Sequence, residues 1–354
     1  MHQRLLLCSV FLSLFSILSC ISVPVSPPAP KTPVTVPETP VKPNIPDQPI
    51  STPPSKLVIM KGVDVSIPQK DFDEMAKAGI NILTTEWGIE VGIDKAKAFL
   101  DKAEKARLKV VMDGGFTYTA WGFTDSDWDN LPFGKKPVWQ KDLVQNWVKA
   151  LKGHPSIYAW DICNEYGENL PSGPAANQSD WPNTAMTLAQ LKQARNDVLQ
   201  IDPGKPILIR TYSWDLDQPP FDIRSTGLRR PFEAGLAEIV SLNLYSNYLD
   251  NGKLQWPTVI EDVTAESVRI IKSKDPNIKV WLSLAAFEDN QSFQRPTTAS
   301  LSRDINQVLK ISAIDGISYF SWGPTDIGKG KKWYLPETGA DLWDVIKKSI
   351  KVIP

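Results

Sequence analysis

Residues 138–166, VWQKDLVQNWVKALKGHPSIYAWDICNEY, form one complete helix-to-strand unit and indicate the fold of the chain. Apolar side chains recur at helical spacing over residues 138–151, which predicts an amphipathic helix. The run at residues 157–166 is apolar and short, as is typical of a buried strand. Helices that alternate with strands are the repeating units of sheets with parallel strands.

The same alternation extends in both directions from this unit. We expect strands at residues 57–66, 81–88, 109–116, 157–166, 206–214, 238–248, 279–287 and 316–323, and helices at residues 69–78, 93–107, 138–151, 184–200, 259–274, 300–313 and 342–352. This pattern predicts an α/β fold, the closed (β/α)8 TIM barrel, over residues 57–354. A doubly wound open sheet is the alternative, but no glycine-rich phosphate loop follows any of these strands.

Residues 1–20 have the pattern of an export signal. Arg4 is followed by an uncharged apolar run, residues 5–18, which is too short to span a bilayer comfortably. The run ends in ILSC at residues 17–20, which resembles the lipobox of bacterial lipoprotein signal peptides. The resemblance implies cleavage before Cys20, lipidation of its thiol, and a membrane-anchored protein at the cell surface or in the periplasm. An ordinary secretory signal is the alternative.

Residues 21–56 are rich in proline, interspersed with Val, Thr, Ser and Lys. Proline fixes φ and removes backbone donors, so neither a helix nor a sheet can extend through this segment. We expect an extended polyproline-II spacer with a reach on the order of 100 Å. It would tether a catalytic domain to a surface; a proline-rich ligand for a partner domain is the other interpretation.

The composition narrows the chemistry. A formal net charge of -1 gives no bulk attraction to nucleic acid. Only two histidines occur, His2 and His154, which argues against histidine-rich metal sites and histidine general bases. Cys163 has no partner left for a disulfide once Cys8 leaves with the signal and Cys20 is lipidated. We therefore expect a monomer that uses no metal and no cofactor.

Barrel enzymes place their sites at the carboxyl ends of the strands. Here these ends carry carboxylates, amides and aromatic rings, which favours carboxylate chemistry. Cleavage of an acetal needs one carboxyl group that donates a proton and a second one that faces the anomeric carbon. The residues concerned are Glu86, Asp113, Asn164, Glu165, Arg210, Tyr245, Glu288 and Trp322.

The segment HPSIYAWDICNE at residues 154–165 resembles the fourth strand of retaining glycoside hydrolases of the clan that includes family 5 cellulases and mannanases. The resemblance implies that Glu165 is the catalytic acid/base and that Asn164 binds the sugar 2-hydroxyl. By position, Tyr245 matches the tyrosine that hydrogen-bonds the nucleophile, and Trp322 matches the tryptophan that floors the sugar subsite. Residues 110–113, which end in Asp113, resemble the third strand.

The chain departs from this family at two strands. Glu86 stands on the second strand where many members carry Arg, and Leu284 stands where many carry the nucleophilic Glu. Glu288 has the same parity as Leu284, so a continued strand would aim both at the same face. We therefore predict Glu288 as the nucleophile, with Asp289 and Glu86 as the fallback carboxylates.

A long loop after the third strand, residues 116–128, is rich in aromatic residues that include Trp121. Such rings either stack on sugar faces or form a small core under the loop. The predicted function is hydrolysis of a β-linked poly- or oligosaccharide by a retaining mechanism. A catalytically inactive glycan-binding barrel is the main alternative, and a transferase that uses the same covalent intermediate is another.

Overall fold

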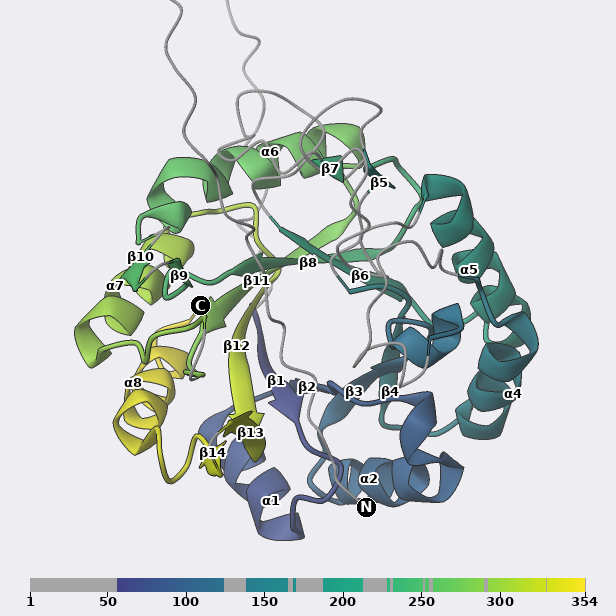
Figure 1. Cartoon of the computed structure of the whole chain (residues 1–354), viewed down its shortest axis with the longest axis horizontal. Coiled ribbons are helices and arrows are strands. Elements are labelled where there is room, and N and C mark those ends of the chain that lie inside the picture. Colours follow the sequence, from purple (N-terminus) through teal and green to yellow (C-terminus); the bar gives the residue numbers. More distant parts are fainter. Residues whose placement is uncertain are drawn as a thin grey trace, which may run out of the picture. The chain divides into compact units, whose positions relative to one another are not determined.

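The computed structural model describes residues 56–123, 138–164, 168–169, 187–212, 228–229, 232–250, 252–254, 257–289, 292–328 and 330–353. Its centre is a closed barrel of parallel strands in the order β1-β12-β11-β8-β6-β4-β3-β2 (Figure 1). The strands are β1 (Leu57–Val63), β2 (Ile82–Thr84), β3 (Lys109–Asp113), β4 (Ile157–Asp161), β6 (Ile207–Tyr212), β8 (Ile239–Leu244), β11 (Lys279–Ala285) and β12 (Gly316–Gly323).

Helices surround the barrel, so the structure confirms the predicted TIM barrel (Figure 1). They are α1 (Gln69–Ala78), α2 (Ile93–Lys105), α4 (Lys141–Leu151), α5 (Leu188–Ile201), α6 (Ala265–Lys274), α7 (Thr298–Leu309) and α8 (Ala340–Ile350). Each coincides with a helix predicted from the sequence, with ends that differ by a few residues. Within the described ranges, none of the helices has the length and apolar character needed to cross a membrane.

Local sequence explains several helix ends. Thr187 and Thr297 open α5 and α7 with capping boxes, in which the threonine side chain accepts from the backbone N–H of the third helical residue. Gly79 ends α1 in a left-handed conformation with φ of 101°, which glycine adopts without a steric penalty. These signals fix where the chain turns back toward the barrel.

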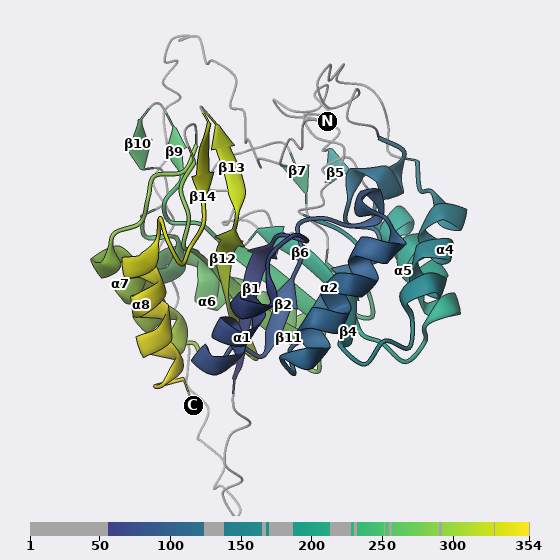
Figure 2. The same ribbon diagram turned by 90° about the horizontal axis from the view of Figure 1, so that it is seen from below.

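Short two-stranded antiparallel sheets lie at one end of the barrel (Figure 2). They are formed by β5 (Glu168–Asn169) with β7 (Leu228–Arg229), β9 (Leu249–Asp250) with β10 (Lys253–Leu254), and β13 (Thr325–Gly328) with β14 (Lys331–Trp333). Since β13 follows β12 directly, this is the end to which the carboxyl termini of the barrel strands point. The sequence did not predict these small sheets.

The barrel interior begins with one apolar layer. Seven strands each contribute one side chain to it, and every one of these is almost completely buried: Ile59, Ile82, Val111, Ala159, Leu208, Ile239 and Trp281. The eighth strand contributes Gly316, where an added Cβ would lie 2.8 Å from atoms of both Ile59 and Trp281. The indole of Trp281 therefore occupies the space that a side chain on β12 would otherwise fill.

The next interior layer is polar. Side chains alternate along a strand, so the residues two positions further along each strand face the same interior. Every one of them is polar or charged and buried: Lys61, Thr84, Asp113, Asp161, Arg210, Ser241, Ser283 and Ser318. The buried polar side chains therefore lie toward the carboxyl ends of the strands, above the apolar layer.

We predict that Gly316→Ala destabilises the protein by about 1–3 kcal/mol, because its methyl group overpacks the apolar layer against Ile59 and Trp281. Gly204→Ala is the matched control, since nothing lies within 4 Å of its added Cβ. Urea unfolding of both variants measures the difference. Equal stability of the two variants would show that the layer has room to spare.

Candidate functional site

Arg210 on β6 is the centre of the polar layer. Its Nε donates to Asp161 on β4 at 2.5 Å, its Nη1 to Glu86 after β2 at 2.6 Å, and its Nη2 to the backbone oxygen of Thr85 at 3.0 Å. The guanidinium also lies 4.6 Å from the ring centroid of Phe116. The guanidinium thus connects residues of three strands with the loop after β3, because it is planar and presents several N–H donors in a fixed geometry.

The two carboxylates bound to Arg210 differ in exposure. The Asp161 side chain is fully buried, whereas the Glu86 side chain is 26% exposed. Burial raises the pKa of Asp161 to about 7, against the opposing attraction of Arg210, and Glu86 and Asp113 raise this pKa further. Asp161 is thus a structural carboxylate, while Glu86 is partly exposed at the carboxyl end of the barrel.

The Asp113 side chain is fully buried, and its carboxylate accepts hydrogen bonds from groups of the protein itself. Its carboxylate accepts from the backbone N–H groups of Ile89, Gly115 and Phe116 and from the hydroxyl of Thr117, at 2.7–3.1 Å. Burial raises the pKa of Asp113, and these hydrogen bonds oppose the rise. Asp113 was also predicted to bind the substrate, as one of the strand-end residues. Its buried carboxylate instead fixes the loops after β2 and β3, so a substrate contact does not fit its position.

A buried lysine that the sequence analysis overlooked lies in the same layer. Lys61 Nζ donates to Asn243 Oδ1 on β8 at 2.9 Å and lies 5.8 Å from the ring centroid of Phe320. The signal was available in the alternation of β1, because Lys61 follows the core residue Ile59 by two positions. Lys61 is thus a second buried cation in the same layer as Arg210.

An aromatic cluster covers the side of the site formed by β8, β11 and β12. The ring centroid of Tyr245 lies 5.5 Å from that of Phe287, 5.8 Å from that of Phe293 and 5.7 Å from that of Phe320. Tyr245 itself is buried, whereas Phe320 is only half-buried. Among the four rings of this cluster, Phe320 is therefore the one that is partly exposed.

Trp322 does not occupy the position predicted for it. Its side chain is completely buried, its Nε1 donates to Asp71 on α1 at 3.1 Å, and its ring packs edge-on against Trp343 on α8. The ring thus lies between the barrel and its helices, and cannot floor a sugar subsite. The half-buried aromatic residue of β12 is Phe320, two residues earlier.

The side chain of Trp121 likewise lies in the protein interior. It is fully buried, donates from Nε1 to the backbone oxygen of Gly115 at 2.6 Å, and packs against Trp139 with centroids 4.8 Å apart. Of the two interpretations of this loop, the small core fits Trp121 and the sugar contact does not. Residues 124–137 of the same loop lie outside the described residues.

The predicted acid/base, Glu165, also lies outside the described residues, as does Cys20. The residue before Glu165 is described: Asn164 is 9% exposed just beyond the end of β4. The roles of Glu165 and Asn164 remain predictions.

The prediction of Glu288 assumed that Leu284 faces the barrel interior, and this assumption is wrong. Trp281 belongs to the interior layer, so Ser283 and Ala285 share its face and Leu284 points outward to the helices. A strand residue with the same parity as Leu284, as assumed for Glu288, would therefore point away from the barrel interior. Glu288 itself is half-buried in the segment after β11, and its role as nucleophile stays a prediction without that support.

Asp289, the other carboxylate considered after β11, stabilises a turn. Its Oδ1 accepts from the backbone N–H groups of Ser292 and Phe293 at 2.6 and 2.8 Å. Such bonds fold the chain back after β11.

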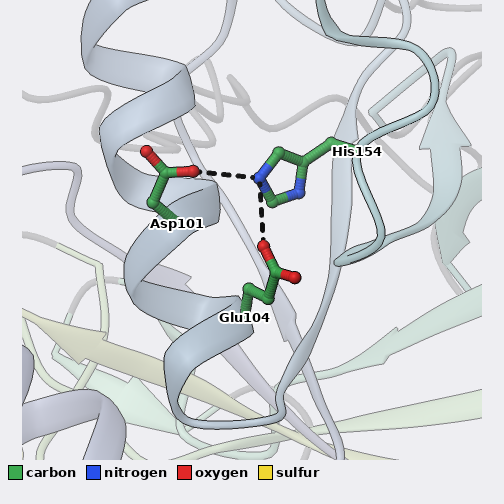
Figure 3. Close-up of side chains that lie close together, drawn as sticks. All are labelled: Asp101, Glu104 and His154. Atoms are coloured by element: carbon green, nitrogen blue, oxygen red, sulfur yellow. Dashed lines mark hydrogen bonds and ion pairs between the residues drawn. The ribbon is translucent and has the colours of Figure 1, made fainter.

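One group of described residues has the composition of a metal site: Asp101, Glu104 and His154 (Figure 3). His154 Nε2 lies 3.2 Å from Asp101 Oδ1 and 3.8 Å from Glu104 Oε2. However, His154 Nδ1 accepts from the backbone N–H of Ser156, which leaves the proton of a neutral ring on Nε2. A protonated Nε2 donates to Asp101 and cannot bind a metal, so this group ties α2 to the loop before β4.

The comparisons with known proteins agree with the barrel. Neither a family model nor a curated sequence matches the chain. Among solved structures, an endo-β-1,4-mannanase from Thermotoga petrophila aligns with a TM-score of 0.55 at 11% identity, over 84% of this chain and 77% of that one. An endocellulase from Pyrococcus horikoshii aligns with a TM-score of 0.53 at 11% identity, over 84% and 92%. A GH5_18 protein from Bifidobacterium longum subsp. infantis aligns with a TM-score of 0.55 at 12% identity, over 84% and 79%.

At these identities the likeness is one of fold. The chain has the barrel that mannanase and endocellulase structures share, and its carboxyl end carries buried polar residues and a half-buried aromatic ring. Activity has to be argued from the site.

We predict that Asp161 makes stability depend on pH. Its folded pKa of about 7 exceeds that of an unfolded Asp, about 3.9, so the folded protein retains a proton between those values. The contribution of Asp161 to the free energy of unfolding therefore falls as the pH rises from about 3.9 to about 7, by at most about 1.4 kcal/mol per pH unit. Above about pH 7 this contribution no longer changes with pH.

Asp161→Asn cannot titrate and should lose this dependence. Urea unfolding between pH 4.5 and 8 measures it as the difference between wild type and variant, with the exposed Asp94→Asn as control. A difference that stays constant over this range would contradict the assigned pKa.

Proposed function

We propose that the chain binds a β-linked glycan at the carboxyl end of its barrel and hydrolyses a glycosidic bond there, with Glu165 as the catalytic acid. The observation that supports this most is the combination of Glu86 and Phe320 at one open end. A partly exposed carboxylate and a half-buried ring are what acetal cleavage and sugar stacking need.

The residues around these two support the same function. Lys61, Asn243 and Arg210 form buried polar contacts beneath the open end, and Arg210 holds the carboxylate of Glu86 in a fixed orientation. The alignment with the mannanase and endocellulase structures supports a carbohydrate substrate by analogy of fold.

A glycan-binding protein without catalysis is the second candidate. The interior face of β11 ends in Ala285, close to the place where the family resemblance implies a nucleophile. Isothermal titration with a panel of β-linked oligosaccharides, combined with mass spectrometry of the same mixtures, distinguishes the two functions. Binding without cleavage products would favour the second.

We predict that Glu165→Gln slows the cleavage of unactivated oligosaccharides by about 10²–10⁴-fold and that of activated aryl glycosides much less. A good leaving group needs little protonation, so loss of the acid matters less for it. Steady-state rates on both substrate types measure the effect. Glu104→Gln, on the helix α2, is the matched control, and equal losses on both substrates would contradict the role of Glu165.

We also propose that the chain is an exported lipoprotein, anchored through Cys20 and held off the membrane by the proline-rich segment at residues 21–56. Two acyl chains give stable anchoring where one does not, at about 0.8 kcal/mol per buried CH2. Cys20→Ala should move the protein from the membrane fraction to the soluble fraction, as measured by fractionation and labelling with a fatty acid. A wild-type protein that is soluble after export would contradict the proposal.

A further inference from the structure

Charged side chains are distributed unevenly along the axis of the barrel. In a βα unit the helix returns the chain to the start of the next strand, so the helices end at the amino end of the barrel. Five of the described helices have an acidic residue in the first turn and lysine in the last turn: α1, α2, α4, α6 and α8. Positive charge therefore collects at the amino end, although the net charge of the chain is only -1.

Six cations define what we call the amino-end face. Two stand directly before β1 and at the start of β11, and four lie in or directly after the last turns of α1, α7 and α8. Each of these side chains is exposed or half-buried. They are Lys56, Lys77, Lys279, Lys310, Lys348 and Lys351. The helix α8 ends on the side of the barrel opposite to the small sheets, so this face lies opposite the candidate site (Figure 2).

The connections that carry these lysines contact one another. The backbone N–H of Leu57 donates to the backbone oxygen of Asp315 at 3.0 Å, and the Asp315 carboxylate accepts from the backbone N–H of Val280 at 2.9 Å. The starts of β1 and β11 thus adjoin the connection from α7 to β12. A Cβ added to Gly79 would lie 2.8 Å from Ile350, so the end of α8 adjoins the end of α1. The amino-end face is therefore one continuous surface.

Few carboxylates oppose these cations. Among the described residues of the connections around β1, the acidic ones are Asp275 and Asp315. Asp275 accepts from the backbone N–H of Asn277, and Asp315 pairs with Lys272 at 3.0 Å and also attracts Lys56. Within the described ranges, no salt bridge involves any of the six lysines. The face thus keeps an excess of positive charge.

Helix geometry explains only part of this excess. Lysines near a helix end offset the helix dipole, which accounts for Lys77 and Lys348. Lys56 and Lys279 lie at strand starts, so the same explanation does not apply to them. Val352, directly after α8, is 68% exposed beside these cations. Lysines around an exposed apolar side chain suit the surface of a bilayer, because their stems cover apolar groups while their ammonium groups reach the headgroups.

We propose that the amino-end face binds anionic phospholipid headgroups of the bilayer that carries the lipid anchor; this rests on the proposed lipoprotein anchor. The segment at residues 21–55 joins the barrel at this face, because Lys56 directly precedes β1. The segment sets the largest distance between barrel and bilayer, and the face holds the barrel near the bilayer within that reach. Tethering raises the effective concentration, so a weak attraction is sufficient. The carboxyl end, with Glu86 and Phe320, then faces away from the bilayer.

Vesicle flotation of the full chain tests the proposal. Cys20→Ala, which lacks the thiol to be lipidated, should bind vesicles of phosphatidylglycerol and phosphatidylcholine in equal parts far more tightly than vesicles of phosphatidylcholine alone. This difference should disappear at about 1 M salt, where the Debye length is about 3 Å. Residues 5–18 are common to all variants below, so any contribution of this apolar segment cancels in their comparison.

Two triple variants in the Cys20→Ala background locate the contact. The first removes three exposed lysines of the amino-end face: Lys77→Gln, Lys310→Gln and Lys351→Gln. It should bind the anionic vesicles about 10²-fold more weakly, since each lysine near an anionic surface contributes about fivefold in affinity. The control removes the same charge from the carboxyl end, in the first turn of α2 and in β14: Lys95→Gln, Lys331→Gln and Lys332→Gln. It should bind as tightly as its parent, and thermal unfolding checks that both variants are folded.

Equal losses in the two triple variants, or unchanged binding in the first, would overturn the proposal. Tighter binding of inorganic polyphosphate than of the anionic vesicles, at equal phosphate concentration, would also overturn it and assign the face to a soluble polyanion. The anchor is tested separately, because lipidated wild type should float with phosphatidylcholine vesicles at any salt concentration. Wild type that does not float there, together with the expected contrast between the triple variants, would contradict the lipid anchor alone.

Discussion

The buried charge of Arg210 is the constraint on which the carboxyl end of the barrel depends. A guanidinium with almost no exposure is tolerated only when carboxylates and carbonyls surround it, since an unpaired buried charge costs several kcal/mol. Arg210 finds these partners on β4 and at the end of β2, with the loop after β3 stacked over it. The positions of three strand ends are therefore linked through one side chain, and Glu86 is oriented as a consequence.

The layers of the barrel explain why so few of its polar residues can meet a ligand. The apolar layer around Trp281 seals the interior, and the polar layer above it is buried as well. Most polar groups of that second layer are used within the protein, as the hydrogen bonds of Asp113 and Asp161 illustrate. Side chains above this layer include partly exposed ones, among them Glu86 and Phe320.

Helical and strand periodicity was sufficient to predict the barrel, because short apolar strands alternate with amphipathic helices along most of residues 57–354. The connection between β6 and β8 is the exception, since no helix was predicted there. The polar layer was also predictable in principle, since Lys61 and Arg210 follow core residues by two positions. Alternation fails as a guide where a strand is irregular or has ended, however. Trp322 lies within β12, where the pairing with β1 shifts register after Phe320. Its parity matches that of Phe320, yet its indole donates to Asp71 on the helix side. Glu288 lies beyond the end of β11, so its direction did not follow from the parity of Leu284.

The two departures of this chain from the clan that it resembles concern the surroundings of Arg210 and the end of β11. Many members of that clan carry Arg on the second strand and the nucleophilic Glu on the seventh, whereas this chain carries Glu86 at the end of the second and Arg210 on the fifth. An arginine in place of Glu86 would put a second cation near Arg210, and two buried cations without a shared carboxylate would repel each other. Glu86 instead neutralises Arg210. At the end of β11, Phe287 and Phe320 pack against each other. The buried charge of Arg210 thus accounts for the carboxylate at the end of the second strand.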